Sequence, residues 1–122
     1  MNSIEITGNL GADPELRVTD NGPVAQFSIA NTPRLRDGSQ GNTTWVTVQV
    51  WDDLASLVAE NLKKGSFVSV SGRLIQQSWT DKDSGAKRSR HVIRAASVWK
   101  PLTDRRKSEP VSEEQDPLFF DW

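Results

Sequence analysis

Apolar and polar residues alternate along five segments of the chain. In residues 2–10, Ile4 and Ile6 point to one side of an extended chain, while Glu5 and Thr7 point to the other. A period of two residues is typical of a strand with one face in a core and the other in water. The segments that we predict to be strands on this basis are residues 2–10, 24–30, 43–51, 66–78 and 87–99.

Between the third and fourth of these strands the apolar period changes to that of a helix. Apolar residues stand at i, i+3, i+4 and i+8, namely Leu54, Leu57, Val58 and Leu62. We expect Asp52 or Asp53 to cap the first turn of this helix and Gly65 to close it. Three strands, a helix and two further strands are the element order of a five-stranded Greek-key OB-fold barrel, so we predict an all-β domain of that architecture with one short helix.

Turns and bends separate the predicted strands. Residues 20–23 read Asp-Asn-Gly-Pro, which is a turn signal, and residues 37–42 form a polar, glycine-rich loop. Residues 81–85 are expected to form a hairpin turn, and residues 8–11 a bulge or bend. Gly72 lies on the apolar face of its strand, where we expect the sharp bend that a small barrel requires.

The net charge of −1 hides a difference between two parts of the chain. Residues 1–102 hold 12 basic and 10 acidic residues, whereas residues 103–122 hold 3 basic and 6 acidic ones. We predict that the first part is the barrel domain. The second part has too little apolar content to offset the entropy of an ordered chain, so we expect a disordered acidic tail.

The composition argues against several classes of protein. The chain has no Cys for disulfides or thiolate metal sites, and no apolar run approaches the roughly 20 residues of a membrane span. Residues 1–5 lack the basic and apolar regions of a signal peptide. We therefore expect a cytoplasmic protein without disulfides or thiolate metal sites.

Tryptophan stands on the polar faces of two predicted strands. In the third strand, Trp45 and Trp51 share the polar side, opposite a row of three valines. In the fourth strand, Trp79 shares the polar side with Arg73. A nucleobase of any identity can stack on an indole ring, with a gain of about 1–3 kcal/mol per base. We predict that these three rings stack the bases of a single-stranded nucleic acid.

Basic residues near these faces would neutralise phosphates and release counterions. The predicted backbone-binding residues are Arg34, Arg36, Arg73, Lys82, Lys87, Arg88 and Arg90. An outward Trp can instead pack under a loop or in a subunit interface. This second interpretation is favoured for Trp99, which ends a strand close to Pro101.

The residues do not favour catalysis. His91 is the only histidine, and a single His on a strand is more often a surface or packing residue than a ligand. Asp52 and Asp53 are explained by the start of a helix. Residues 8–11 lack the Lys of a phosphate loop, and no Ser lies in a nucleophile-elbow pattern. We therefore predict a binding protein that is not an enzyme.

The sequence resembles the bacterial single-stranded DNA-binding proteins over residues 2 to about 100. The segments that carry the resemblance are Gly8-Asn9-Leu10-Gly11-Ala12-Asp13-Pro14-Glu15-Leu16-Arg17, Asn21-Gly22, Phe27-Ser28-Ile29-Ala30, Trp51 with Leu54, Leu62-Lys63-Lys64-Gly65 and Val70-Ser71-Gly72-Arg73-Leu74. Residues 32–34 and 71–74 are similar to actinobacterial members. The resemblance implies an OB fold, sequence-tolerant binding of single strands, no cofactor and a homotetramer. It also implies stacking by Trp45 and Trp79, and by Trp51 at a position where the family often has Phe.

Two positions of the barrel and the end of the chain depart from the family pattern. Leu35 stands where well-known members have a further stacking Trp, and Val46 stands where many have a His associated with tetramer assembly, so a homodimer stays open. The family's acidic, aromatic tip is matched only in kind, by Asp116, Pro117, Leu118, Phe119, Phe120, Asp121 and Trp122. We expect this tip to recruit partner proteins as a short peptide that places its aromatic residues in a pocket.

These observations predict sequence-independent binding and protection of single-stranded DNA in replication, recombination and repair, with replication and repair proteins recruited by the tip. The expected location is the cytoplasm, in association with the nucleoid. Two alternatives remain open. A replication adaptor that mainly binds protein would bury its Trp faces at an interface, and an RNA-binding OB domain would read the 2′-hydroxyl.

Overall fold

The computed structural model describes residues 1–101 and 119–121. Its strands are β1 (Ile4–Leu10), β2 (Glu15–Thr19), β3 (Gly22–Asn31), β4 (Thr44–Trp51), β5 (Phe67–Thr80), β6 (Lys87–Pro101) and β7 (Phe119–Asp121), and its helix is α1 (Asp52–Asn61). Five of these strands correspond to the five that the alternation predicts. The helix lies between the third and fourth of them, as expected.

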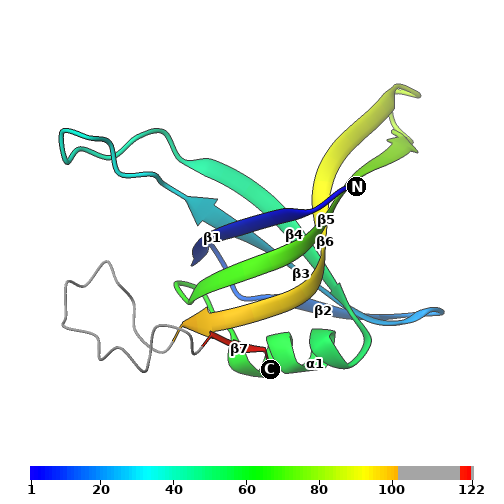
Figure 1. Cartoon of the computed structure of the whole chain (residues 1–122). Coiled ribbons are helices and arrows are strands. Elements are labelled where there is room, and N and C mark those ends of the chain that lie inside the picture. The colour runs from blue at the N-terminus through cyan, green and yellow to red at the C-terminus, as the bar shows by residue number, and fades with distance from the viewer. Residues whose placement is uncertain (102–118, 122) are drawn as a thin grey trace.

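Five strands close into a barrel (Figure 1). Neighbouring strands follow the order β1-β5-β6-β4-β3, and pairing of β1 with β3 closes the ring. All of these pairings are antiparallel except that of β4 with β6, which is parallel over Thr47–Gln49 and Val92–Arg94. The prediction of a five-stranded OB-fold barrel is therefore confirmed.

β1 contacts two strands because it changes partner near its end. Ile4 to Asn9 pair with β5, and Asn9 and Leu10 pair with β3. The sequence predicts a bulge or bend at residues 8–11, which is where β1 changes its partner from β5 to β3. It allows one strand to join the two ends of the sheet.

Gly72 lies at the tightest contact between β5 and β6. The register of the two strands shifts between Ser71 and Gly72. A Cβ atom on Gly72 would lie 2.1 Å from the carbonyl oxygen of Arg94, which leaves no room for a side chain. The bend predicted at this glycine therefore coincides with an irregularity in the ladder and a close backbone approach.

The core fills the barrel and extends under α1, which lies across one end of the barrel (Figure 1). Inward residues of the barrel strands are fully buried, among them Ile29, Val48 and Ile93. The helix adds Ala55 and Val58 to the same cluster. Burial of these side chains is the main source of stability for a domain of this kind.

The helix ends are built differently from the expectation. Trp51 occupies the N-cap position and makes no side-chain cap, so Asp52 and Asp53 lie in the first turn and do not cap it. Carboxylates in the first turn still interact favourably with the positive end of the helix dipole. Leu62 is the C-cap, and Gly65, with φ of +89°, lies in the next turn, where the Ser66 N–H donates to the Lys63 carbonyl at 2.9 Å.

β2 is not among the strands that we predict from the sequence. It pairs with β3 through a hairpin whose turn carries the signal noted at residues 20–23. All five of its residues are exposed, Leu16 and Val18 included. Leu16 and Val18 do alternate with polar residues, but the run is only five residues long, and the alternation marks no buried face because both side chains are exposed.

The end of the chain is described only in part. Phe119–Asp121 form β7, antiparallel to β6 at Trp99–Pro101, within the segment where we expect a disordered tail. β4 pairs with β6 only at Val92–Arg94, and the later part of that edge is open to a further strand. The remaining residues of the predicted tail, 103–118 and 122, lie outside the described part of the chain.

Candidate nucleic-acid interface

The polar side of β4 forms the centre of an outer face of the barrel. Cross-strand pairs place Gln49 beside Gln26 of β3 and Arg94 of β6, and Trp45 lies at the far end of the same side. Trp45 is 61% exposed and Trp79 of β5 is 47% exposed. Both rings are therefore open to solvent, as the sequence predicts for rings that are to stack bases.

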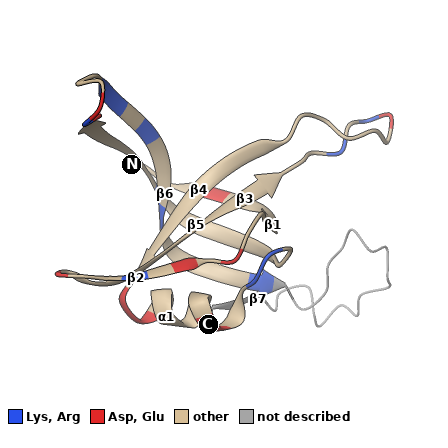
Figure 2. Ribbon diagram, turned by 180° about the vertical axis from the view of Figure 1, so that it is seen from behind, with Lys and Arg blue, Asp and Glu red and all other residues tan. Residues whose placement is uncertain are grey.

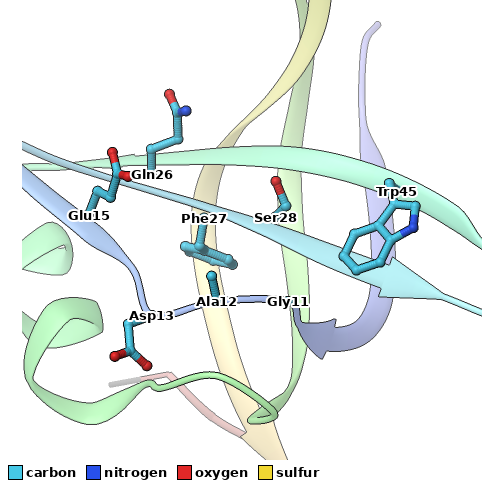
Figure 3. Close-up of a pocket in the computed structure, with 8 residues that line it drawn as sticks. All are labelled: Gly11, Ala12, Asp13, Glu15, Gln26, Phe27, Ser28 and Trp45. Carbon is cyan, nitrogen blue, oxygen red and sulfur yellow. The ribbon is translucent and has the colours of Figure 1, made fainter.

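The Trp45 ring rests on the backbone that follows β1. A Cβ atom on Gly11 would lie 2.6 Å from Cζ3 of the ring, so only glycine permits this contact. Figure 3 shows the ring at one side of a pocket and Glu15 and Gln26 at the other. This pocket has a volume of about 380 Å³ and is lined by Gly11, Ala12, Asp13, Glu15, Gln26, Phe27, Ser28 and Trp45.

We expect Gly11→Ala to displace the Trp45 ring and weaken nucleic-acid binding by up to the energy of one stack, about 1–3 kcal/mol. The contacting atoms belong to an exposed side chain, so the thermal unfolding temperature should change little. Binding of a labelled oligonucleotide by fluorescence anisotropy measures the effect. The control is Gly11→Ala in a Trp45→Ala background, where it should cost nothing further; an equal loss in both backgrounds would contradict the role assigned to Gly11.

Trp79 lies on the hairpin that β5 and β6 form beyond the barrel. The guanidinium Cζ of Arg90 is 5.8 Å from the ring centroid, within the range of a cation–π contact. A second pocket, of about 470 Å³, contains Trp79 with Lys87 and Arg88 in its wall. An aromatic ring and predicted phosphate-binding residues therefore meet on one hairpin.

Trp51 differs from the other two rings. It is partly buried, and the Cζ atom of Arg94 lies 5.2 Å from its centroid. Its indole Nε1 is buried and has no hydrogen-bond partner within the described residues. The face of Trp51 near Arg94 is therefore already occupied in the free protein.

A hydrogen-bonded cluster of three glutamines and one arginine connects four strands on this side. The Gln49 Nε2 donates to the Gln26 Oε1 at 3.1 Å, and the Gln77 Nε2 donates to the Gln49 Oε1 at 2.9 Å. Arg90 donates to the Oε1 atoms of Gln77 and Gln26 at 3.3 and 3.4 Å. The cluster links the β5–β6 hairpin, which carries Trp79, to the sheet that carries Trp45.

The predicted basic residues lie on two projecting segments and on the barrel (Figure 2). Arg34 and Arg36 are in the loop between β3 and β4. Lys82, Lys87, Arg88 and Arg90 are in the β5–β6 hairpin and its turn, whereas Arg73 is nearer the barrel. Among the described residues only Arg88 of this set forms an ion pair, with Asp81 at 3.5 Å.

Sequence reasoning missed several residues of this face. Gln26, Gln77 and Gln49 carry no special signal, because a glutamine on a polar face is ordinary. Arg94 follows Arg90 at a spacing of four and so shares its side of β6. This spacing could have identified Arg94 from the sequence.

Two further observations limit the chemistry of the described residues. Hydrogen bonds from the Ser39 hydroxyl and the Ser39 backbone N–H lower the pKa of Asp37, which keeps the loop between β3 and β4 anionic at this point. Within residues 1–101 and 119–121, no group of three or more His, Cys, Asp or Glu side chains could hold a metal ion.

Comparison with known proteins identifies the family. The model of the family described as "Single-strand binding protein family" matches residues 1–100. The chain belongs to this family. The family is named for binding, so the expectation of a binding protein rather than an enzyme is confirmed at this level, and so is the resemblance noted in the sequence.

The single-stranded DNA-binding protein of Corynebacterium glutamicum is one relative of the chain. The two are 43% identical over 107 residues, which cover 83% of this chain and 47% of the relative. The single-stranded DNA-binding protein of Wolinella succinogenes is 37% identical, over 98% of this chain and 75% of that protein. The small single-stranded DNA-binding protein of Streptomyces coelicolor has a crystal structure that matches with a TM-score of 0.70 and 31% identity, over 82% of this chain and 94% of that one. The chain thus spans about half the length of the Corynebacterium relative.

The predicted partner-binding tip is only partly covered. Asp116, Pro117, Leu118 and Trp122 lie outside the described residues, and Phe119, Phe120 and Asp121 are described by the pairing of β7 alone. In the described part of the chain no helix has the length and apolar character that a membrane crossing would need.

Proposed function

We propose that the protein binds single-stranded DNA without regard to sequence and protects it during replication, recombination and repair. The observation that carries this proposal is the pair of exposed indole rings, Trp45 on β4 and Trp79 on the β5–β6 hairpin. Arginines without acidic partners among the described residues lie on the same strands and loops. Rings that accept any base and cations that accept any phosphate together give binding that tolerates sequence. The names of the relatives support the same ligand.

We expect titration with oligo(dT) to quench the intrinsic Trp fluorescence and to saturate at a fixed ratio of nucleotides to protein. Quenching follows from stacking of bases on exposed indoles, and the affinity should fall as salt rises because phosphate binding releases counterions. The measurement is a fluorescence titration at several salt concentrations. No quenching by oligo(dT) in a folded and assembled protein would favour the alternative of an adaptor that binds protein through these faces.

A parallel titration with oligo(U) of equal length tests the RNA alternative. A protein that stacks bases and holds phosphates should bind both polymers, with no requirement for a 2′-hydroxyl. Clear preference for RNA would indicate that the hydroxyl is read directly and would replace the DNA proposal.

Two finer parts of the proposal concern assembly and recruitment. We propose a homotetramer, or a homodimer if Val46 changes assembly, and recruitment of replication and repair proteins by residues 116–122. The excess of acidic over basic residues in 103–122 supports recruitment, since an acidic, aromatic peptide fits a basic pocket. Removal of residues 116–122 should abolish capture of such partners and leave oligo(dT) binding intact.

A further inference from the structure

Two arginines face each other across the β5–β6 ladder without an acidic partner. Arg73 and Arg94 are direct cross-strand partners, so their side chains leave the sheet on the same side. Both are exposed. Like charges directly opposite each other destabilise a sheet. Within the described residues neither forms an ion pair, so the repulsion is not offset there.

Arg94 is held in place by a ring and not by an acid. Its Cζ lies 5.2 Å from the centroid of Trp51, whose side chain is partly buried. A guanidinium is planar, and its N–H donors lie in that plane. Stacking on an indole therefore fixes the group while it leaves the N–H donors available to an anion.

Other arginines of the hairpin are already engaged. Arg90 donates to the side-chain amide oxygens of Gln77 and Gln26, and Arg88 forms an ion pair with Asp81. Neither Arg73 nor Arg94 has a comparable acceptor in the described part of the chain. Among the described residues they are the one pair of directly opposed arginines on this ladder, and no hydrogen-bond acceptor occupies their N–H donors.

We propose that Arg73 and Arg94 jointly hold one phosphate of the bound strand, and that Trp51 serves to position Arg94. Guanidinium groups match the oxygens of a phosphate, and two of them around one phosphodiester remove the repulsion that the free protein bears. The site takes a backbone phosphate of a single-stranded nucleic acid. It rests on the proposed function, and it assigns to Trp51 a role different from the base stacking of Trp45 and Trp79.

The test is the salt dependence of oligo(dT) affinity for Arg73→Gln, Arg94→Gln and the double variant. If the two arginines share one phosphate, the double variant should make the negative slope of log affinity against log salt shallower by about 0.7, which is the contribution of one phosphate in a single strand. The second substitution should then add little to the first. The matched control is Arg17→Gln, which removes an exposed arginine that pairs with Glu15 on β2 and should leave the slope unchanged.

Two results would overturn the shared site while wild-type binding stands. A slope that becomes shallower by about 1.4, with the effects of the two single substitutions adding up, would mean that the arginines bind two separate phosphates. An unchanged slope in the double variant would mean no phosphate there at all. Loss of wild-type oligo(dT) binding is a different failure, because it would remove the proposed function and this site together.

The role of Trp51 has its own readout. Trp51→Phe keeps a flat ring under Arg94 and should retain the affinity and the slope, whereas Trp51→Leu should behave like Arg94→Gln. In the Arg94→Gln background, Trp51→Leu should cause no further loss of affinity. A further loss in that background would show that the ring stacks a base itself, which contradicts the positioning role.

Discussion

A variant that carries both Trp45→Ala and Trp79→Ala should bind oligo(dT) at least about 30-fold more weakly than the wild type. Each stack is worth about 1–3 kcal/mol, so two lost stacks amount to about 2–6 kcal/mol, and each 1.4 kcal/mol is a tenfold change in affinity. Both rings are largely exposed and contribute little to the core. Anisotropy of a labelled oligonucleotide is the appropriate measurement, because the substitutions remove the fluorescent groups themselves.

The salt dependence of the same variant separates stacking from phosphate binding. The two substitutions remove no cation, so the slope of log affinity against log salt should be that of the wild type. Trp99→Phe, at the partly buried end of β6, serves as the control for loss of an indole away from this face. If the double alanine variant bound as tightly as the wild type and remained folded, base stacking on these rings would be ruled out.

The barrel could be predicted because each of its strands buries one face. In β4, Val48 and Val50 are fully buried while Trp45 on the other side is exposed, so the alternation in the sequence reports the two environments directly. The single change of period gives α1 for the same reason. In β2 the residues alternate too, but Leu16 and Val18 are both exposed, so the alternation of this short run does not report burial, and the strand is established by its pairing with β3.

The candidate site could be predicted only in part. Period two places Trp45 and Trp51 on one side of β4, yet it cannot show that Arg94 covers one ring while Gly11 supports the other. Those differences depend on which strands become neighbours after the barrel closes. β4 and β6 are distant in sequence and parallel, so the meeting of Gln49 with Arg94 is a product of topology.

The position of Gly72 links the stability of the barrel to the proposed phosphate site. The glycine directly precedes Arg73, and it lies against the carbonyl of Arg94. The absence of a side chain there allows β5 and β6 to approach closely, at the shift of register next to the two arginines. Packing at this one residue thus affects both the β5–β6 ladder of the barrel and the alignment of Arg73 with Arg94.

Gly72→Ala should therefore destabilise the fold and weaken binding together. The added Cβ would meet backbone atoms of Arg94 and Ala95, which cannot turn aside as a side chain can. Overpacking of this kind costs about 1–3 kcal/mol, and each kcal/mol lowers the unfolding temperature of a small domain by about 4–8 °C. Thermal unfolding followed by circular dichroism measures the loss.

The control for Gly72→Ala is Ser71→Ala, a change on the adjacent residue that adds no atom to the ladder and should leave the unfolding temperature nearly unchanged. If the two strands separate to admit the new Cβ, the arginines move with them, and the salt slope for oligo(dT) should fall toward that of the Arg73→Gln variant. A destabilised variant with the wild-type slope would show that the phosphate site does not depend on the bend. A variant as stable as the wild type would show that the close approach at Gly72 is not required for closure of the barrel.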